Sequence, residues 1–221
     1  MRVLVIAPHM DDETLGAGGA ITKHVTAGDQ VTVCFIANRA YNHVYDNCMI
    51  QKQKEAALKS KEILGYNEAI FFDLNDEQLD EKTINILVPL EKLITELRPE
   101  IIYLNHRGDT NQDHSSVFKA GIIAARTFAN PYLKRILCYE ILSSTDQAPP
   151  FQEYGFLPNY YVNIEDFIQQ KINALKCYED ELRIFPHPRS VDGVVTLAKK
   201  RGMEIGYQYA EAFSLVREKW D

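Results

Sequence analysis

The feature that most constrains the fold of this chain is the alternation of short apolar runs with longer segments of helical periodicity. The first run, Val3–Ala7, is rich in β-branched residues, contains no polar position and ends at Pro8. An uninterrupted apolar run of this length is typical of a strand that is covered on both faces, as in a parallel sheet. A helix is then expected over Thr14–Ala27, ending near Gly28.

The same alternation continues along the chain. Gly65 and the pair Arg98-Pro99 mark the ends of two expected helices, because glycine adopts the left-handed cap conformation and proline disfavours helix in the residue before it. The stretch Ala148–Tyr161, rich in proline and aromatic residues, is expected to be a loop or hairpin. The further expected strands are Val31–Ile36, Ala69–Phe72, Ile101–Leu104, Ile136–Leu142 and Ala212–Arg217, and the further expected helices are Ile50–Leu64, Lys82–Leu97, His114–Phe128, Glu165–Asp180 and Val191–Gly206.

Repeated strand–helix units with short connections predict an α/β fold in which a doubly wound, mainly parallel sheet forms the middle of three layers. A single core of this kind accommodates roughly 200 to 250 residues, so we expect one domain over residues 1–221. Ligands of such sheets bind at the edge where the strands end. The loops after the first and fourth strands are therefore where a functional site is expected.

Charge and composition narrow the range of partners. The chain has 31 acidic and 24 basic side chains and a formal net charge of −7, which repels nucleic acid and anionic bilayers at long range. No apolar run approaches the roughly 20 residues of a membrane helix, and the first residues lack the zones of a signal peptide, so we expect a cytoplasmic location. The four cysteines are spread without a Cys-x-x-Cys pair, and we expect reduced thiols of which at least two are buried.

The loop after the first strand favours a cation. His9 and Asp12 are three residues apart, a spacing at which one turn directs two side chains the same way, so both can reach one metal ion. Three adjacent carboxylates, Asp11, Asp12 and Glu13, would repel a phosphate group at this helix start. Asp11 is better placed to accept a proton from water at the metal than to complete the ligand set. Helix-capping acids would explain the carboxylates, but not the histidine.

The loop after the fourth expected strand offers further ligands. It contains His106, Asp109, Asp113 and His114 at the same edge of the sheet. His114 would supply a third ligand beside His9 and Asp12, and two histidines with one carboxylate are typical of a catalytic zinc site. Asp113 could orient a neighbouring imidazole. Two imidazoles favour zinc over magnesium, with other divalent transition metals as alternatives.

The segment Pro8-His9-Met10-Asp11-Asp12-Glu13 resembles the His-Pro-Asp-Asp-Glu signature of the PIG-L/LmbE-like N-acetylglucosaminyl deacetylases, and Asn111-Gln112-Asp113-His114 resembles their second motif. The resemblance extends to Gly16-Ala17-Gly18-Gly19 and to Tyr209-Ala210-Glu211-Ala212-Phe213. It implies a Rossmann-like, metal-dependent hydrolase that removes acetyl groups from amino sugars. It also implies that His9, Asp12 and His114 bind zinc, and that Asp11 is the general base.

The chain departs from the family pattern in three places. Met10 replaces a proline, the segment Ala37–Tyr41 lacks a Gly/Glu-rich pattern, and Asn111 stands where several members have a histidine that protonates the leaving amine or stabilises the oxyanion. An amide cannot act as a titrating acid. His187, held between two prolines, and His106 are the candidates for that acid.

Two further residues are candidates for binding substrate. Asp76 lies in a segment that resembles the Pro-Asp-Gly segment after the third strand of relatives, where it could accept hydrogen bonds from sugar hydroxyls. Arg189 could help to hold a phosphate on a nucleotide-linked sugar.

The expected function is thus a zinc-dependent hydrolase that releases acetate from an N-acetylated amino sugar or sugar conjugate. One alternative is a magnesium-dependent phosphoryl-transfer or phosphatase-like enzyme, which would leave His9 and His114 without a role. Another is an inactive sugar-binding protein on the same scaffold, against which the retained Asp11 argues. The expected partner is a small amino sugar, without nucleic acid or membrane insertion, and a homo-oligomer is compatible with the sequence.

Overall fold

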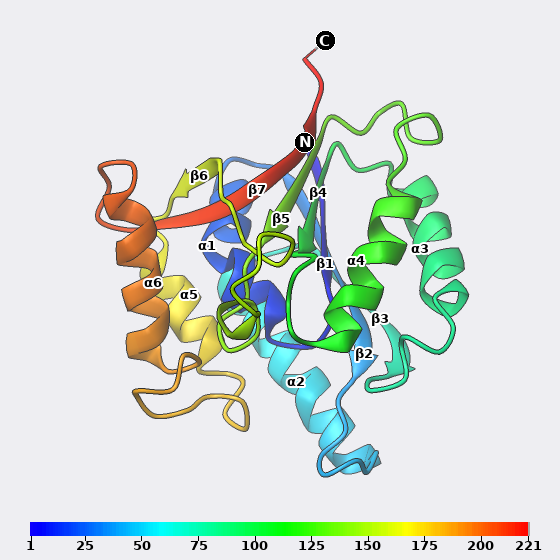
Figure 1. The fold of residues 1–221 in the computed structure, drawn as a ribbon, viewed down its shortest axis with the longest axis horizontal. Helices are drawn as coiled ribbons and strands as arrows, with labels where there is room; N and C mark the ends of the chain where they lie inside the picture. The colour runs from blue at the N-terminus through cyan, green and yellow to red at the C-terminus, as the bar shows by residue number, and fades with distance from the viewer. Residues whose placement is uncertain (221) are drawn as a thin grey trace.

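The computed structural model describes residues 1–220, and its centre is one seven-stranded sheet with the strand order β3-β2-β1-β4-β5-β7-β6 (Figure 1). The strands are β1 (Arg2–Ala7), β2 (Gln30–Asn38), β3 (Glu68–Asn75), β4 (Ile101–Asn105), β5 (Arg135–Tyr139), β6 (Tyr160–Asn163) and β7 (Ala210–Glu218). The helices are α1 (Asp12–Thr26), α2 (Asn47–Leu64), α3 (Ile84–Leu97), α4 (Gln112–Ala124), α5 (Ile168–Leu175) and α6 (Val191–Met203), with a short 3₁₀ turn at Thr145–Gln147.

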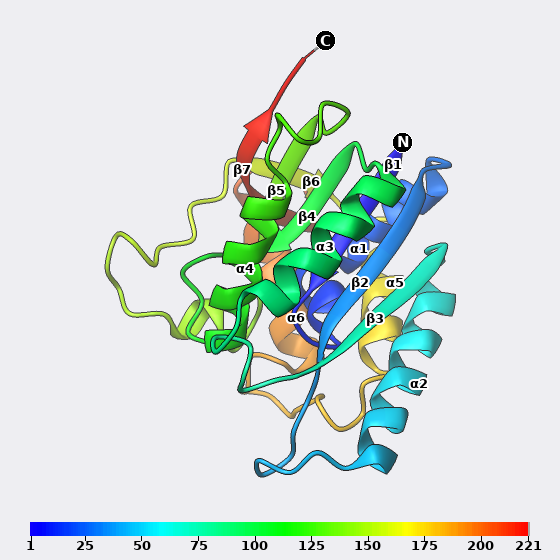
Figure 2. The ribbon, with the colours of Figure 1, turned by 90° about the vertical axis from the view of Figure 1, so that its right-hand side faces the viewer.

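The helices cover both faces of the sheet, so the expected three layers are confirmed (Figures 1 and 2). The sequence of strand β1 reflects these layers, because its side chains alternate between two apolar cores, one on each face of the sheet. Val3 and Val5 pack into the core beneath α1, α2 and α5, whereas Leu4 and Ile6 pack into the core beneath α3 and α4. An all-apolar strand is what this position in the middle of the sheet requires.

Strands β1 to β5 are parallel to one another, which confirms the predicted doubly wound class. The chain runs outward from β1 to β2 and β3, and then returns to the other side of β1 with β4. The direction of winding therefore reverses between β1 and β4, and the loops that follow these two strands lie side by side at the sheet edge. This is the position at which doubly wound folds bind ligands.

The far end of the sheet differs from the sequence prediction. Strand β7 is antiparallel to β5, and β6 is antiparallel to β7. The four residues of β6 begin inside the stretch that was expected to be a loop or hairpin, and β5 ends at Tyr139 instead of Leu142. The partners of β6 are supplied by a strand some 50 residues later in the chain, so its pairing leaves no local signal.

The cysteines and the lengths of the helices complete the description of the fold. All four cysteines are free thiols, and Cys34 and Cys138 are buried, as expected. Over residues 1–220, no helix is both long and apolar enough to cross a bilayer.

A candidate metal centre where the sheet winding reverses

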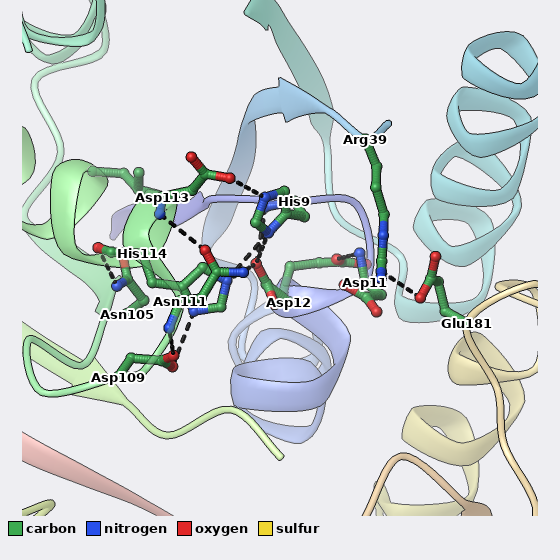
Figure 3. A network of polar contacts seen from close by, with 12 residues as sticks. His9, Asp11, Asp12, Arg39, Asn105, Asp109, Asn111, Asp113, His114 and Glu181 are labelled. Atoms are coloured by element: carbon green, nitrogen blue, oxygen red, sulfur yellow. Dashed lines mark hydrogen bonds and ion pairs between the residues drawn. The ribbon is translucent and has the colours of Figure 1, made fainter. Parts of the chain in front are cut away.

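The turn between β1 and α1 has an unusual backbone at Asp11, whose φ of 142° and ψ of −24° are rare for a residue with a side chain. Its carbonyl oxygen accepts hydrogen bonds from the backbone N–H groups of Thr14 and Leu15, and its own N–H donates to Glu13 Oε2. Helix α1 then begins at Asp12. The consequence is that the carboxylates of Asp11 and Asp12, adjacent in sequence, point in different directions (Figure 3).

Side chains from the two loops converge on one point. His9 Nδ1 lies 3.4 Å from Asp12 Oδ2, and His114 Nε2 lies 3.3 Å from the same oxygen. The two ring nitrogens are 3.1 Å apart, and all three residues are buried. One ligand atom from each residue falls within 4.8 Å of the others, a spacing that could hold a metal ion. The structure therefore brings together the three residues that the sequence predicted as ligands.

Each histidine also contacts a carboxylate through its other ring nitrogen. His9 Nε2 lies 3.1 Å from Asp113 Oδ2, and His114 Nδ1 lies 2.9 Å from Asp109 Oδ2. Such a contact fixes the ring orientation and leaves the opposite nitrogen for a metal. Asp113 was expected to orient an imidazole, whereas Asp109 had no predicted role. The signal that could have identified Asp109 is its place in the same loop, five residues before His114.

Asp11 lies to the other side of this group, toward Arg39 and Glu181 (Figure 3). Arg189 Nη1 is 3.5 Å from Asp11 Oδ2 and 2.8 Å from Glu181 Oε2, and Arg39 forms an ion pair with Glu181 as well. Asp11 is buried. Arg39 and Glu181 were not predicted, because they are far apart in sequence and neither belongs to a ligand-spaced motif.

The electrostatics of the centre favour a bound cation. Burial would lower the pKa of His9, but hydrogen bonds to Asp113 and Asp12 outweigh it and raise the pKa to about 9. Burial would also lower the pKa of His114, but the charge of Asp12 and the contact with Asp109 outweigh it and raise this pKa to about 10. Without a metal, protons therefore supply positive charge between the carboxylates at neutral pH.

The pKa values of the two aspartates of the turn shift in opposite directions. Burial would raise the pKa of Asp12, but the charge of His114 and the hydrogen bonds from both histidines hold it well below the ordinary value. The pKa of Asp11 rises to about 8, mainly through burial and then through the charges of Asp12 and Glu181, against the lowering effect of Arg189. Asp12 thus stays an anion suited to a cation, while Asp11 has the basicity of a proton acceptor.

The centre opens into a cleft with a volume of about 640 Å³. Its walls come from the loops after several strands, and among the predicted binding residues Asp76, Asn111 and Arg189 line it. Asp76 accepts a hydrogen bond from the backbone N–H of Ala40, and Asn111 Oδ1 accepts one from the N–H of Asp113. Neither contact would prevent these side chains from meeting a substrate.

The structure does not bring the two candidate acids to the wall of this cleft. His106 Nε2 lies 3.1 Å from the carbonyl oxygen of Tyr154, and its ring packs edge-on against Phe156. His187 Nδ1 accepts a hydrogen bond from the backbone N–H of Arg189. Both histidines thus bond to nearby backbone, while Asp109 and Arg189, close to them in sequence, reach the centre.

Comparison with known proteins extends the resemblance over the whole chain. The diacetylchitobiose deacetylase of Thermococcus kodakarensis is 25% identical over 97% of this chain and 83% of its own length. A zinc-inhibited form of teicoplanin deacetylase matches in structure with a TM-score of 0.76 and 14% identity, covering both chains fully. The 4-carboxy-2-hydroxymuconate hydratase of Pseudomonas putida matches with a TM-score of 0.79 and 19% identity, over 100% of this chain and 98% of the hydratase.

A fold shared by deacetylases and a hydratase does not by itself decide the reaction. The sequence match is more specific. The model of the family described as GlcNAc-PI de-N-acetylase (PIG-L) matches residues 4–125, more than half of the chain and the part that carries both loops of the centre. This protein therefore belongs to the PIG-L family.

Proposed function

We propose that this protein is a metal-dependent N-deacetylase that releases acetate from an N-acetylated amino sugar of the N-acetylglucosamine type. The observation that carries the proposal is the convergence of His9, Asp12 and His114 beside Asp11, in a chain of the PIG-L family. The deacetylase relative acts on an N-acetylated sugar by its name. No relative described above supports the phosphoryl-transfer alternative.

We propose zinc as the metal, held by His9 Nδ1, Asp12 Oδ2 and His114 Nε2. Two imidazoles and one carboxylate suit a borderline-soft ion, and the backing carboxylates of Asp113 and Asp109 complete the pattern of a zinc site. A divalent cation bound there supplies Lewis acidity, which polarises a carbonyl group and makes water more acidic.

Asp11 is the acid–base group of the proposed reaction. In its ionised form, its carboxylate accepts a proton from the water molecule that attacks the acetamide carbon. When the C–N bond breaks, the leaving nitrogen takes a proton from Asp11, so that amide and water become acetate and a free amine. Participation of His187 or His106 as the acid stays a prediction. Asp11 lines the cleft, whereas neither of these histidines does. Arg189, next to Asp11 Oδ2, keeps this carboxylate in place.

Asn111, Asp76 and Arg189 are the proposed substrate contacts, because all three line the cleft. The Oδ1 atom of Asn111 is engaged with the backbone of Asp113, which leaves its NH₂ group to donate to the acetamide oxygen. Asp76 accepts hydrogen bonds from sugar hydroxyls. A volume of about 640 Å³ also leaves room for a group attached to the sugar.

An acetate-release screen tests the proposal. Purified protein is analysed for bound metal and then incubated with N-acetylglucosamine, its oligomers and its conjugates. We expect close to one zinc per chain, acetate release from at least one N-acetylated sugar, loss of activity after chelation and recovery on adding one equivalent of zinc. Sugar binding without acetate release would instead support the inactive sugar-binding alternative. Cell fractionation and light scattering test the cytoplasmic location and the homo-oligomer that the sequence left open.

A further inference from the structure

Glu13 is a buried carboxylate for which the proposed reaction has no use. Its side chain is fully buried, and no ion pair is formed by it within residues 1–220. A buried carboxylate without a cation costs stability unless hydrogen bonds compensate. The contacts of Glu13 therefore indicate what it does.

Those contacts divide between its two oxygen atoms. Oε1 accepts hydrogen bonds from three hydroxyl groups, Thr14 Oγ1 at 2.6 Å, Tyr178 Oη at 2.6 Å and Ser60 Oγ at 3.1 Å. These hydroxyls come from α1, from the segment after α5 and from α2, so the carboxylate is anchored to three parts of the molecule. Oε2 accepts one hydrogen bond, from the backbone N–H of Asp11 at 3.2 Å.

The hydrogen bond from Asp11 N–H connects the anchored carboxylate of Glu13 to a backbone that needs support. The Asp11 φ of 142° is unfavourable for a residue with a side chain and persists only if the surroundings hold it. The carbonyl side of Asp11 is held by Thr14 N and Leu15 N, and the N–H side is held by Glu13. The turn that carries Tyr178 also carries Glu181, which pairs with Arg189 beside the Asp11 carboxylate.

We infer that Glu13 is a positioning residue that holds the strained backbone of Asp11, and thereby directs the Asp11 carboxylate toward the cleft. The inference rests on the proposed function, in which Asp11 transfers the proton. It assigns the effect of Glu13 to one acceptor atom, Oε2, and not to the negative charge of the side chain.

Two substitutions separate the effect of the acceptor atom of Glu13 from the effect of its negative charge. Glu13→Asp keeps the charge but is one methylene shorter, so the carboxylate cannot reach both the hydroxyl groups and the N–H of Asp11. Glu13→Gln loses the charge but keeps the length. Its amide oxygen can accept from Asp11 N. Its NH₂ group faces the three hydroxyls and can donate to two of them, and Thr14 Oγ1 and Ser60 Oγ, 3.0 Å apart, can bond each other. Positioning predicts that the glutamine variant is the more active, whereas a requirement for charge predicts the reverse.

We expect Glu13→Asp to lower kcat at least tenfold with KM changed less than twofold and with the metal content of the wild type. We expect Glu13→Gln to keep kcat within about threefold. Glu211→Asp is the matched control, because Glu211 is another buried carboxylate that accepts backbone N–H groups of α1, from Gly19 and Ala20, away from Asp11. This variant should lose stability without a change in kcat. Equal kcat in Glu13→Asp and wild type, or a tenfold loss in Glu13→Gln, would overturn the inference.

A crystal structure of Glu13→Asp makes the test independent of the assay. The φ of Asp11 should leave the positive region in this variant and remain positive in Glu13→Gln. If the wild-type protein releases no acetate, the proposed function fails, but the two structures still decide whether Glu13 positions Asp11. If Glu13→Asp does not fold, the activity and structure of Glu13→Gln decide the question alone, because the inference requires both to be close to those of the wild type.

Discussion

Each histidine of the candidate centre divides its two ring nitrogens between different partners. His9 and His114 direct one nitrogen toward Asp12 and toward each other, and the second nitrogen toward Asp113 or Asp109. The sequence was sufficient to predict that His9, Asp12 and His114 lie together, because the residue types of two loops, and the position of both loops at one edge of the sheet, indicate it. It did not assign a role to Asp109, although that residue lies in the same loop as His114. It could not predict the Arg39–Glu181 pair, since this depends on a contact between distant segments.

At this scale, replacing Asp11 by asparagine tests the proposed base. The amide has nearly the same shape but accepts no proton, so turnover should fall by about 10² to 10⁴-fold. Bound zinc should remain near one equivalent, because Asp11 is not among the proposed ligands. Activity is measured as acetate release and zinc by elemental analysis. Wild-type turnover in this variant would contradict the assignment, whereas His114→Ala should lose both metal and activity.

Replacing Asp109 by asparagine tests the support of His114. Loss of the carboxylate beside His114 Nδ1 should weaken zinc binding by about 10 to 100-fold, because the ring is less well oriented and less basic. Competition with a chelator of known affinity measures the change. Asp146→Asn, at the exposed 3₁₀ turn, is the control and should bind zinc like the wild type. An unchanged affinity in the Asp109 variant would show that the contact has no role in metal binding.

At the scale of the elements, the site depends on how closely α1 approaches the sheet. A Cβ atom built on Gly16 would lie 2.1 Å from the ring of Tyr139 on β5, whose hydroxyl donates to the carbonyl of Ile6 on β1. Sequence patterns placed α1 and the parallel strands β1 to β5 well. They did not reveal the orientation of β7 or the existence of β6, because both depend on pairing between strands distant in the chain.

Gly16→Ala should therefore destabilise the protein. Overpacking of this kind typically costs about 1–3 kcal/mol, and the ring of Tyr139 is held by its own hydrogen bond. Urea unfolding should show a lower midpoint for this variant. Gly155→Ala is the control, because its added Cβ would meet no atom closer than the Gln152 carbonyl oxygen at 3.5 Å. Equal midpoints for Gly16→Ala and wild type would contradict the close packing of α1 on β5.

At the scale of the whole molecule, folding and metal binding are linked through protons. The pKa values of His9 and His114 are raised to about 9 and about 10 in the metal-free fold, above the ordinary value of 6.5. A raised pKa contributes stability that is fully present below pH 6.5 and is lost as the pH rises through the folded values. Metal binding should show the opposite dependence, since the ion replaces protons.

The contribution of these histidines to the free energy of unfolding of the metal-free protein should thus fall between about pH 6.5 and 10. Denaturant unfolding at several pH values measures the free energy of unfolding of the metal-free protein. Subtracting the values for His114→Ala isolates the part of its pH dependence that comes from His114. Over the same interval, zinc affinity should rise with pH, and calorimetry in buffers of different ionisation enthalpy should detect proton release. Zinc affinity that is independent of pH would contradict protonated histidines in the metal-free centre.

The fold alone leaves the reaction open, because the hydratase of Pseudomonas putida shares it. The proposed reaction therefore depends on whether His9 and His114 bind one common ion. Anomalous diffraction from zinc-loaded crystals, recorded on both sides of the zinc absorption edge, tests this directly. A single strong peak should lie within bonding distance of His9 Nδ1, Asp12 Oδ2 and His114 Nε2. A peak at another position, or no peak between the two histidines, would contradict this prediction.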